Sequence, residues 1–167
     1  MEKWTSLPLN WVKINFDTAI WDSFSAQATI CRDSKGQVLH MFSQISPPCS
    51  PNVGEALAAQ LACSLATTFS IYHFILEGDS EVVVHALQNP NSIRDWRISS
   101  VILDILYSVP IAFVWEGRQI KRSVNLCVLS VVRWAAVGSH SNISTSFISF
   151  LFSSPTSGED SHSVCLL

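Results

Sequence analysis

The most constraining stretch of this chain is an apolar run, residues 71–76, that breaks at Gly78 and is followed by Asp79 and Ser80. A helical pattern begins directly after it. This order is typical of a buried strand, a tight turn and the start of a helix. Asp79 is therefore expected at the carboxyl end of a strand, where open α/β sheets place their sites. Asp79 or Ser80 also suits the N-cap of the helix, so a purely structural role remains an alternative.

The composition indicates one folded domain in an intracellular setting. Of the 167 residues, 48% are hydrophobic and 14% are charged, which provides material for a core and argues against disorder of the whole chain. The five cysteines are scattered without metal-ligand spacing, which favours a reducing compartment, nuclear or cytoplasmic, over secretion. No segment reaches the roughly 20 apolar residues of a membrane span, so we expect no membrane contact. We also expect a monomer. The net charge of −3 argues against tight nonspecific nucleic-acid binding but permits a local basic patch.

The first part of the chain predicts an antiparallel meander. Residues 11–16 alternate between polar and apolar positions, as a strand with one buried face does, and Asp17 follows at the expected end of that strand. Two further extended runs, residues 24–32 and 37–45, flank an Asp-Ser-Lys-Gly sequence. This is a hairpin signal, because Gly36 can adopt a positive φ.

The second part predicts alternating helices and strands. Asn52 is an expected cap of the first helix, and Glu55 three residues later completes a capping-box pattern. In chain order, the expected elements are a helix from residue 54, the strand over 71–76, a helix over 80–88, a helix from Asp95 to Pro110, a strand over 111–115 and a helix over 123–136. One mixed sheet with helices on its faces accommodates this order. The expected domain spans residues 11–136, between an arm (1–10) and a Ser-rich, loosely ordered tail (137–167).

Three acids stand at comparable places in this scheme: Asp17 ends the first strand, Glu55 begins the first helix and Asp79 ends the fourth strand. Carboxylates gathered in a low-dielectric cleft repel one another, and a hard divalent cation, most often Mg²⁺, is the usual way to hold them together. Two such ions about 4 Å apart can promote phosphodiester cleavage. Taken alone, capping explains Glu55 and Asp79 better than a site does, because acids are common in first helical turns.

Five short motifs occur in a telling order, at residues 13–19, 31–36, 55–59, 77–80 and 122–125. Together they resemble the ribonuclease H type-1 domain, in particular its plant, retrotransposon-derived branch, over roughly residues 11–136. The resemblance implies a five-stranded mixed sheet with three antiparallel strands first, and an endonuclease that hydrolyses the RNA strand of RNA–DNA hybrids with two Mg²⁺ ions, or with Mn²⁺. Residue by residue, Asp17, Glu55 and Asp79 match catalytic, metal-binding acids of that family.

The chain departs from this family at the position of its fourth acid, which lies four residues after Asn125. That position is Leu129, and no acid occurs between Glu116 and Glu159. Leucine cannot bind a cation, so weaker metal binding and slower chemistry are expected. Thr18, where the family usually has glycine, adds a side chain close to the expected path of the substrate backbone.

The expected contacts with nucleic acid come from a basic cluster late in the chain. Its members are Arg118, Lys121, Arg122 and the nearby Asn125. An ordinary solvated loop explains this cluster equally well. Two functions therefore remain open: a hybrid ribonuclease whose activity Leu129 impairs, and a catalytically inactive nucleic-acid-binding or interaction domain of transposon origin.

Overall fold

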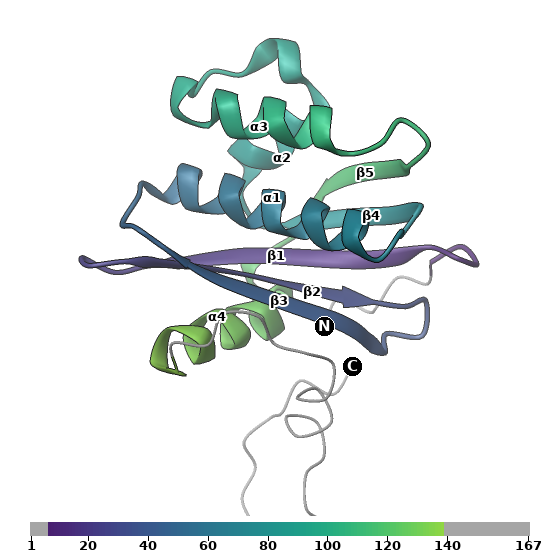
Figure 1. Ribbon diagram of the computed structural model, residues 1–167, viewed down its shortest axis with the longest axis horizontal. Helices are drawn as coiled ribbons and strands as arrows, with labels where there is room; N and C mark the ends of the chain where they lie inside the picture. Colours follow the sequence, from purple (N-terminus) through teal and green to yellow (C-terminus); the bar gives the residue numbers. More distant parts are fainter. Residues whose placement is uncertain (1–6, 139–167) are drawn as a thin grey trace, which may run out of the picture.

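The structure is a computed structural model that describes residues 7–138, shown in Figure 1. The predicted arm (residues 1–10) lies mostly outside the described residues, as does the predicted tail (137–167) apart from its first two residues. Within the described part, no helix combines the length and the apolarity needed to cross a membrane.

The described residues form strands and helices in the order β-β-β-α-β-α-α-β-α. The elements are β1 (Val12–Ile20), β2 (Ser25–Arg32), β3 (Val38–Ser46), α1 (Pro51–Thr68), β4 (His73–Gly78), α2 (Glu81–Gln88), α3 (Trp96–Ser108), β5 (Val114–Gln119) and α4 (Leu126–Gly138), with short 3-10 turns η1 (Pro90–Ser92) and η2 (Arg122–Val124). The strands make one sheet in the order β3-β2-β1-β4-β5. β1, β2 and β3 pair antiparallel, whereas β4 pairs parallel with β1 and with β5. The predicted α/β class and mixed five-stranded sheet are confirmed.

The predicted turn between β2 and β3 is confirmed in detail. Gly36 has a φ of 82°, the left-handed conformation that glycine adopts without strain. The Asp33 carboxylate accepts hydrogen bonds from the N–H groups of Lys35 (2.9 Å) and Gln37 (2.8 Å). This Asx-type turn closes the hairpin and fixes the register of the antiparallel strands.

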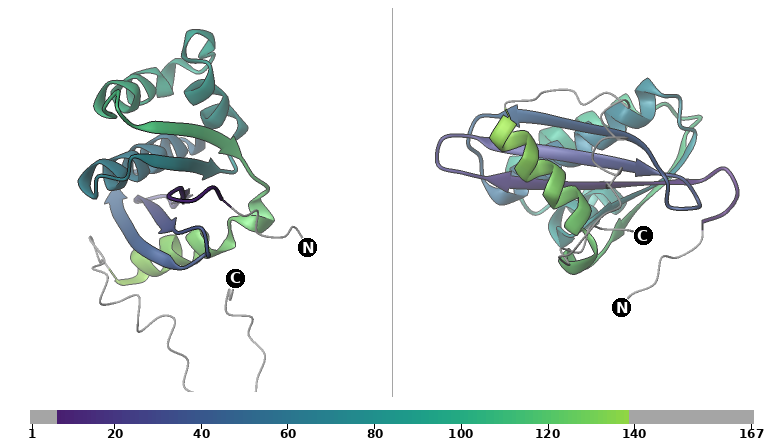
Figure 2. Two further views of the ribbon diagram at one scale, coloured as in Figure 1. Left: turned by 90° about the vertical axis from the view of Figure 1, so that its right-hand side faces the viewer. Right: turned by 90° about the horizontal axis from the view of Figure 1, so that it is seen from below.

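Helices cover both faces of the sheet (Figures 1 and 2). α1 packs on β1 and β2 and is itself covered by α3, while α4 packs on the opposite face against β2 and β1. The buried face of α1 is rich in alanine, including Ala59, Ala62 and Ala66, whereas Leu57 and Leu61 are only partly buried. Small side chains let the helix backbone approach the sheet closely, so the alanines between the leucines form the contact surface.

The start of α1 differs from the prediction. The helix begins at Pro51, with Ser50 as the N-cap, and Ser50 makes no side-chain capping bond. Proline suits the first helical position, because its fixed φ is helical and its missing N–H has no partner there. Asn52 therefore lies inside the helix and its amide donates to Asp95 Oδ2 (2.9 Å), so the predicted capping box of Asn52 and Glu55 is wrong. Of the three prolines in residues 46–54, Pro51 thus lies inside the helix.

The last strand also lies elsewhere than predicted. β5 covers Val114–Gln119 and not the predicted 111–115, so the apolar residues 111–113 precede the strand and the polar residues 116–119 belong to it. β5 is an edge strand with exposed polar side chains. At its start, Val114 N–H donates a hydrogen bond to Tyr72 O (2.8 Å). An apolar run is a poor marker for an edge strand, because only one side of such a strand is enclosed.

A close approach at the end of β4 generates a stability prediction. A Cβ atom added at Gly78 would lie 2.2 Å from the nearest ring carbon of the fully buried Phe16. We expect Gly78→Ala to lower the free energy of unfolding by about 1–3 kcal/mol, as overpacked cores do, in a urea titration.

The matched control is Gly117→Ala, since a Cβ there would have no neighbour closer than 3.7 Å. Equal stability of the two variants would contradict the close packing of Phe16 against the β4 turn.

Candidate metal centre

The pairing of β1 with β4 brings two of the predicted acids together. Asn15 is the register partner of Glu77 in this parallel ladder, and it is the last pair. Asp17 and Asp79 each follow two residues later, so they lie side by side beyond the ladder's end. Asp17 does not end its strand, as the sequence predicts, because β1 continues to Ile20 against β2. Only the pairing of β1 with β4 ends just before Asp17, and the pairing with β2 continues.

A second close approach delivers Glu55. A Cβ atom at Gly54 would lie 2.8 Å from Thr18 Oγ1, so glycine is what allows the first turns of α1 to sit against β1 next to Asp17. Thr18 itself is held by a hydrogen bond from its hydroxyl to Ala26 O (3.0 Å). Thr18 is 7% exposed and packs towards α1, so its side chain is part of the interior and not of an open surface.

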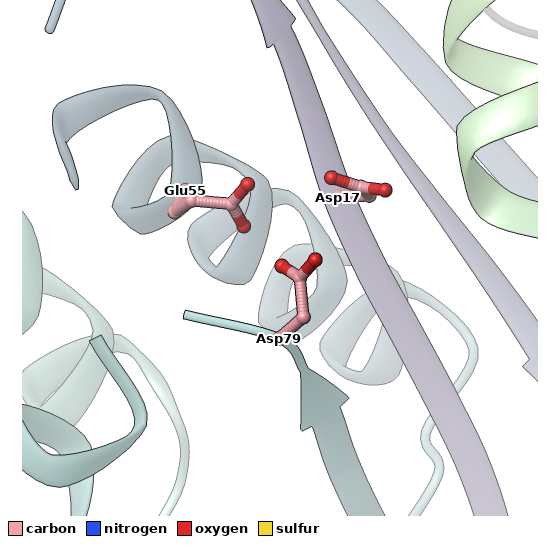
Figure 3. A group of neighbouring side chains, drawn as sticks. All are labelled: Asp17, Glu55 and Asp79. Carbon is pink, nitrogen blue, oxygen red and sulfur yellow. The ribbon is translucent and has the colours of Figure 1, made fainter. Parts of the chain in front are cut away.

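The three carboxyl groups converge from β1, α1 and the end of β4 (Figure 3). One oxygen from each lies within 4.8 Å of the others. Asp17 is 1% exposed and Glu55 is 9% exposed. Asp17 Oδ1 accepts the N–H of Thr18 (2.8 Å), whereas Asp17 Oδ2 and Glu55 Oε2 are buried without a hydrogen-bond donor. Buried acceptors without partners are costly. Hard oxygen ligands with unmet charge fit a divalent cation such as Mg²⁺ or Mn²⁺.

Burial and crowding oppose ionisation of these acids in the metal-free protein. Burial, reinforced by the charge of Asp79, raises the pKa of Asp17 from 3.8 to about 6. Burial, reinforced by the charges of Asp17 and Asp79, raises the pKa of Glu55 from 4.5 to about 9. The metal-free protein therefore favours the protonated form of Glu55. A cation that binds here must displace that proton.

Two of the predicted basic residues lie next to the acids. A hollow of about 560 Å³ is lined by Asp79, Gln119, Ile120, Lys121 and Arg122. The positive charge of Arg122 acts on Asp17 and lowers its pKa, in opposition to burial. The other two predicted contacts, Arg118 and Asn125, are placed differently.

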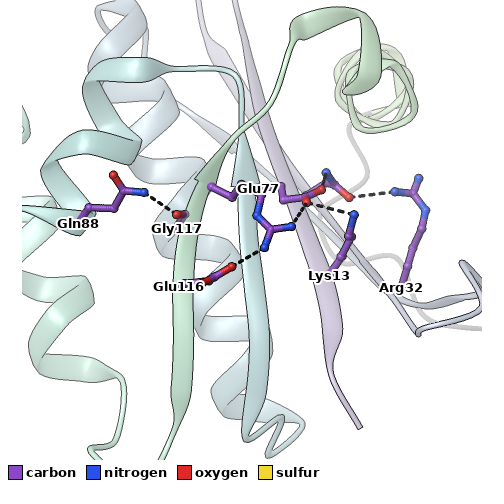
Figure 4. Close-up of polar contacts among 8 residues, drawn as sticks. Lys13, Arg32, Glu77, Gln88, Glu116 and Gly117 are labelled. Atoms are coloured by element: carbon purple, nitrogen blue, oxygen red, sulfur yellow. Dashed lines mark hydrogen bonds and ion pairs between the residues drawn. The ribbon is translucent and has the colours of Figure 1, made fainter. Parts of the chain in front are cut away.

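Arg118 pairs with members of a separate cluster of polar side chains on β1, β2, β4 and β5. Figure 4 labels Lys13, Arg32, Glu77 and Glu116 of this cluster. The Arg118 guanidinium pairs with Glu116 and lies 3.8 Å from Glu77. Glu77 also pairs with Lys13 (3.2 Å). Asn15 donates to Glu77 (3.1 Å) and accepts from Arg32 (3.0 Å). Because carboxylates already match its charge, Arg118 is poorly suited to the predicted contact with phosphate.

Asn125 is a structural residue in this fold. It is 1% exposed, and its amide donates to Phe16 O (2.8 Å), the residue before Asp17. This bond fastens the entry of α4 to β1. The structure gives Asn125 this anchoring role, and its predicted contact with nucleic acid stays a prediction.

Leu129 lies one helical turn after Asn125, and the two residues share a backbone hydrogen bond (3.3 Å). It is 8% exposed. Among the described residues, the group of potential metal ligands at this site consists of Asp17, Glu55 and Asp79, with no fourth member.

Sequence reasoning missed the Glu77 cluster and the anchoring bonds around the site. The signal for the cluster is the polar residues Lys13, Asn15 and Glu77 at positions of β1 and β4 that are otherwise buried. Polar groups in such positions need partners from neighbouring strands. To predict which of these polar groups bond to one another, the order of the strands in the sheet must be known, and the sequence does not give that order.

A five-stranded mixed sheet with three acids at the end of the β1–β4 ladder defines an RNase H-like fold with a candidate metal centre. Residues 15–135 match the reverse transcriptase-like family, and the chain belongs to this family. A comparison with curated protein sequences gives no match.

Solved structures support the fold assignment. RNase H1 from the halophilic archaeon Halobacterium salinarum has a TM-score of 0.69 and 18% identity, covering 78% of this chain and 99% of that one. LC11-RNase H1, isolated from compost by a metagenomic approach, has a TM-score of 0.68 and 20% identity, covering 78% and 99%. LC11-RNase H1 in complex with an RNA/DNA hybrid has a TM-score of 0.68 and 18% identity, covering 77% and 98%. At these identities the likeness shows the fold.

The raised pKa values predict how stability depends on pH and metal. Below about pH 4 these carboxyls are protonated in the folded and unfolded chain alike, so no penalty applies. Between about pH 4 and the raised values, about 6 for Asp17 and about 9 for Glu55, the unfolded chain loses these protons while the folded chain keeps them, so stability falls across this window and levels off above it. We expect Mg²⁺ or Mn²⁺ to raise the melting temperature more at pH 9 than at pH 5, in differential scanning calorimetry.

Glu55→Gln tests the cause of this dependence. It should stabilise the metal-free protein at pH 9 and remove most of the metal-induced rise in melting temperature. The control is Glu81→Gln, at an exposed position of α2. A metal response that survives in the Glu55 variant would contradict the assignment of this residue.

Proposed function

We propose that this chain is a nucleic-acid-binding domain that hydrolyses the RNA strand of RNA–DNA hybrids with the help of divalent cations. The observation that carries the proposal is the convergence of three carboxyl groups within 4.8 Å, with two buried oxygens that lack a donor. The fold is that of RNase H1 enzymes, and LC11-RNase H1 was solved with an RNA/DNA hybrid.

Asp17, Glu55 and Asp79 would hold Mg²⁺ or Mn²⁺, which when bound promotes attack of water on a phosphodiester and stabilises the leaving oxygen. The chain's own groups prepare this site. The N–H of Thr18 fixes Asp17 Oδ1 and leaves Oδ2 for a cation. Ser80 caps α2 by accepting from Val83 N–H (3.4 Å), which holds the turn that carries Asp79. Glu55 releases its proton when a cation binds.

Lys121 and Arg122 are the basic residues that we propose for contact with the nucleic-acid backbone. Both are exposed and both line the hollow beside Asp79. A phosphodiester bound there would lie between these cations and the carboxylates. Cations at this position favour phosphate through charge and, for arginine, through paired N–H donors.

The alternative is a catalytically inactive domain that binds nucleic acid or another partner, and Leu129 is the observation that favours it. The ordered motifs quoted above support an origin in the plant, retrotransposon-derived branch for either function. We also propose that the protein acts as a monomer. A reducing nuclear or cytoplasmic compartment is proposed as well, because the cysteines show no disulfide pattern.

The test of the function is cleavage of a labelled RNA–DNA hybrid with Mg²⁺ or Mn²⁺. Asp79→Asn should lower the rate more than about 100-fold, since the loss of even an outer-shell partner of a metal ligand often costs 10–100-fold. Asp104→Asn, at an exposed position of α3, is the matched control. Hybrid binding without cleavage by the unaltered protein would favour the inactive alternative.

Leu129→Asp tests whether the missing acid limits activity. The resemblance places the family's fourth acid at this position, so an added carboxylate should supply another ligand and raise the cleavage rate roughly tenfold at saturating Mg²⁺. Leu129→Asn has similar size and no charge, so it separates the effect of charge from that of a polar side chain in α4. A rate that stays unchanged or falls in both variants would contradict a limiting role for Leu129.

A further inference from the structure

The strands that carry Asp17 and Asp79 no longer pair with each other at the level of the acids. Their parallel ladder ends at the pair of Asn15 and Glu77. β4 stops at Gly78, whereas β1 continues beside β2. Any further restraint on the separation of the two aspartates must therefore come from outside this ladder.

One segment, residues 120–125, joins β5 to α4 and bonds to both strands beyond the end of their ladder. Ile120 N–H donates a hydrogen bond to Gly78 O (2.9 Å). Asn125 Nδ2 donates to Phe16 O (2.8 Å), and this bond is buried. The segment thus bridges β1 and β4 on the side of the ladder where the acids lie.

Both acceptors belong to the peptide groups that lead directly into the acids. Phe16 precedes Asp17, and Gly78 precedes Asp79. A peptide group is planar, so a hydrogen bond to its oxygen restrains the orientation of the whole group and hence the direction of the next residue's backbone. The two bonds therefore act on the two residues whose carboxylate oxygens come within 4.8 Å of each other.

The Asn125 amide is held in the orientation that this contact needs. Asn125 is 1% exposed. Its backbone N–H donates to Arg122 O (3.0 Å), and its backbone carbonyl accepts from Leu129 N–H (3.3 Å). Phe16 O can only accept, so the nitrogen of the side-chain amide, and not its oxygen, must face it. The side chain therefore acts as a hydrogen-bond donor from a fixed position.

This arrangement leaves the oxygen of the Asn125 side chain without a donor. Asn125 Oδ1 is buried and has no hydrogen-bond partner within the described part of the chain. A buried acceptor without a donor lowers stability, whereas an apolar side chain of similar size, such as leucine, would avoid that loss. Packing alone therefore does not explain an asparagine here, and the donor Nδ2 is what leucine lacks.

We propose, on the basis of the function proposed above, that Asn125 is a positioning residue of the metal centre. It fixes the peptide group before Asp17 to the segment that also holds the peptide group before Asp79. In this way it sets the separation at which the two carboxylates bind a divalent cation. Asn125 acts through the backbone and touches neither the cation nor the nucleic acid. This role differs from the direct contact with nucleic acid that the sequence predicts, and the two roles give different experimental results.

The test measures Mn²⁺ binding to the full chain by calorimetry, without nucleic acid, in Asn125→Leu and Asn125→Ser. Both variants lose the donor, but one keeps the volume of the side chain and the other reduces it, so an effect common to both belongs to the donor. We expect Mn²⁺ to bind roughly three- to tenfold more weakly in each, which is less than the roughly 10–100-fold loss for a group that bonds directly to a metal ligand, because Asn125 acts through a peptide group.

Ile105→Val and Ile105→Ala are the controls for a loss of stability. Ile105 is buried in α3, which covers α1 rather than the sheet. The two variants give a smaller and a larger destabilisation, because they remove different numbers of buried carbon atoms. Both should bind Mn²⁺ like the unaltered protein under conditions in which they are folded. A change confined to the Asn125 variants is then not a consequence of lower stability.

The kinetics of hybrid cleavage separate positioning from direct contact. A displaced carboxylate alters the reaction and not the surface that binds nucleic acid, so the Asn125 variants should lower kcat at least about fivefold and leave KM within about twofold. Unchanged Mn²⁺ affinity in either Asn125 variant would overturn the inference, as would equal weakening in the Ile105 variants. A loss of hybrid affinity with Mn²⁺ affinity intact would also overturn it, because direct contact predicts that result.

The outcomes also distinguish this inference from the proposed function. Weaker Mn²⁺ binding in the Asn125 variants of a protein that does not cleave hybrid would support the positioning role and refute the ribonuclease alone. Cleavage by the unaltered protein, with a Mn²⁺ affinity that does not depend on Asn125, would refute the positioning role alone. Absence of Mn²⁺ binding by the unaltered protein would overturn both.

Discussion

The parallel pairing of β1 with β4 is the constraint on which the rest of this structure depends. It places two acids from distant parts of the chain at one point, just past the pair formed by Asn15 and Glu77. The close contacts at Gly54 and Gly78 then decide which residues can surround that point. One lets α1 deliver Glu55, and the other lets Phe16 fill the space beneath the turn. The backbone geometry therefore brings the acids together, and the packing of the surrounding core must offset the repulsion between their charges.

This arrangement works against the stability of the metal-free protein. Buried carboxyl groups with raised pKa values are a net cost of folding above their ordinary pKa. The apolar contacts between the alanine-rich face of α1 and residues such as Ile14 and Leu76 must exceed that cost. Such a balance is characteristic of sites that need a bound ion to reach their lowest free energy.

Much of the architecture was predictable because its signals are local. The hairpin at Gly36, the cap of α3 at Asp95 and the buried strand before Asp79 each follow from a few neighbouring residues, and the structure confirms them. The ordered motifs also identify the three acids that the structure brings together.

The missed features depend on partners far away in the chain. β1 extends beyond Asp17 because β2 continues beside it, although β4 does not. β5 lies in a polar stretch because one of its sides is open, and Arg118 is occupied by Glu77 and Glu116 from the same sheet. Asn125 bonds to a backbone oxygen 109 residues away. No window of local sequence holds that information.

Glu77 and Asp79 are two residues apart in the chain but have different electrostatic environments. Glu77 is surrounded by Lys13, Asn15 and Arg118, which satisfy both of its oxygens within the protein. The Asp79 carboxylate instead belongs to the group of potential metal ligands with Asp17 and Glu55. Lys13 therefore serves as an internal counterion for Glu77. Two acids in neighbouring turns of the chain thus differ in function because of the side chains that surround them: one is neutralised within the sheet, and the other belongs to the candidate metal centre.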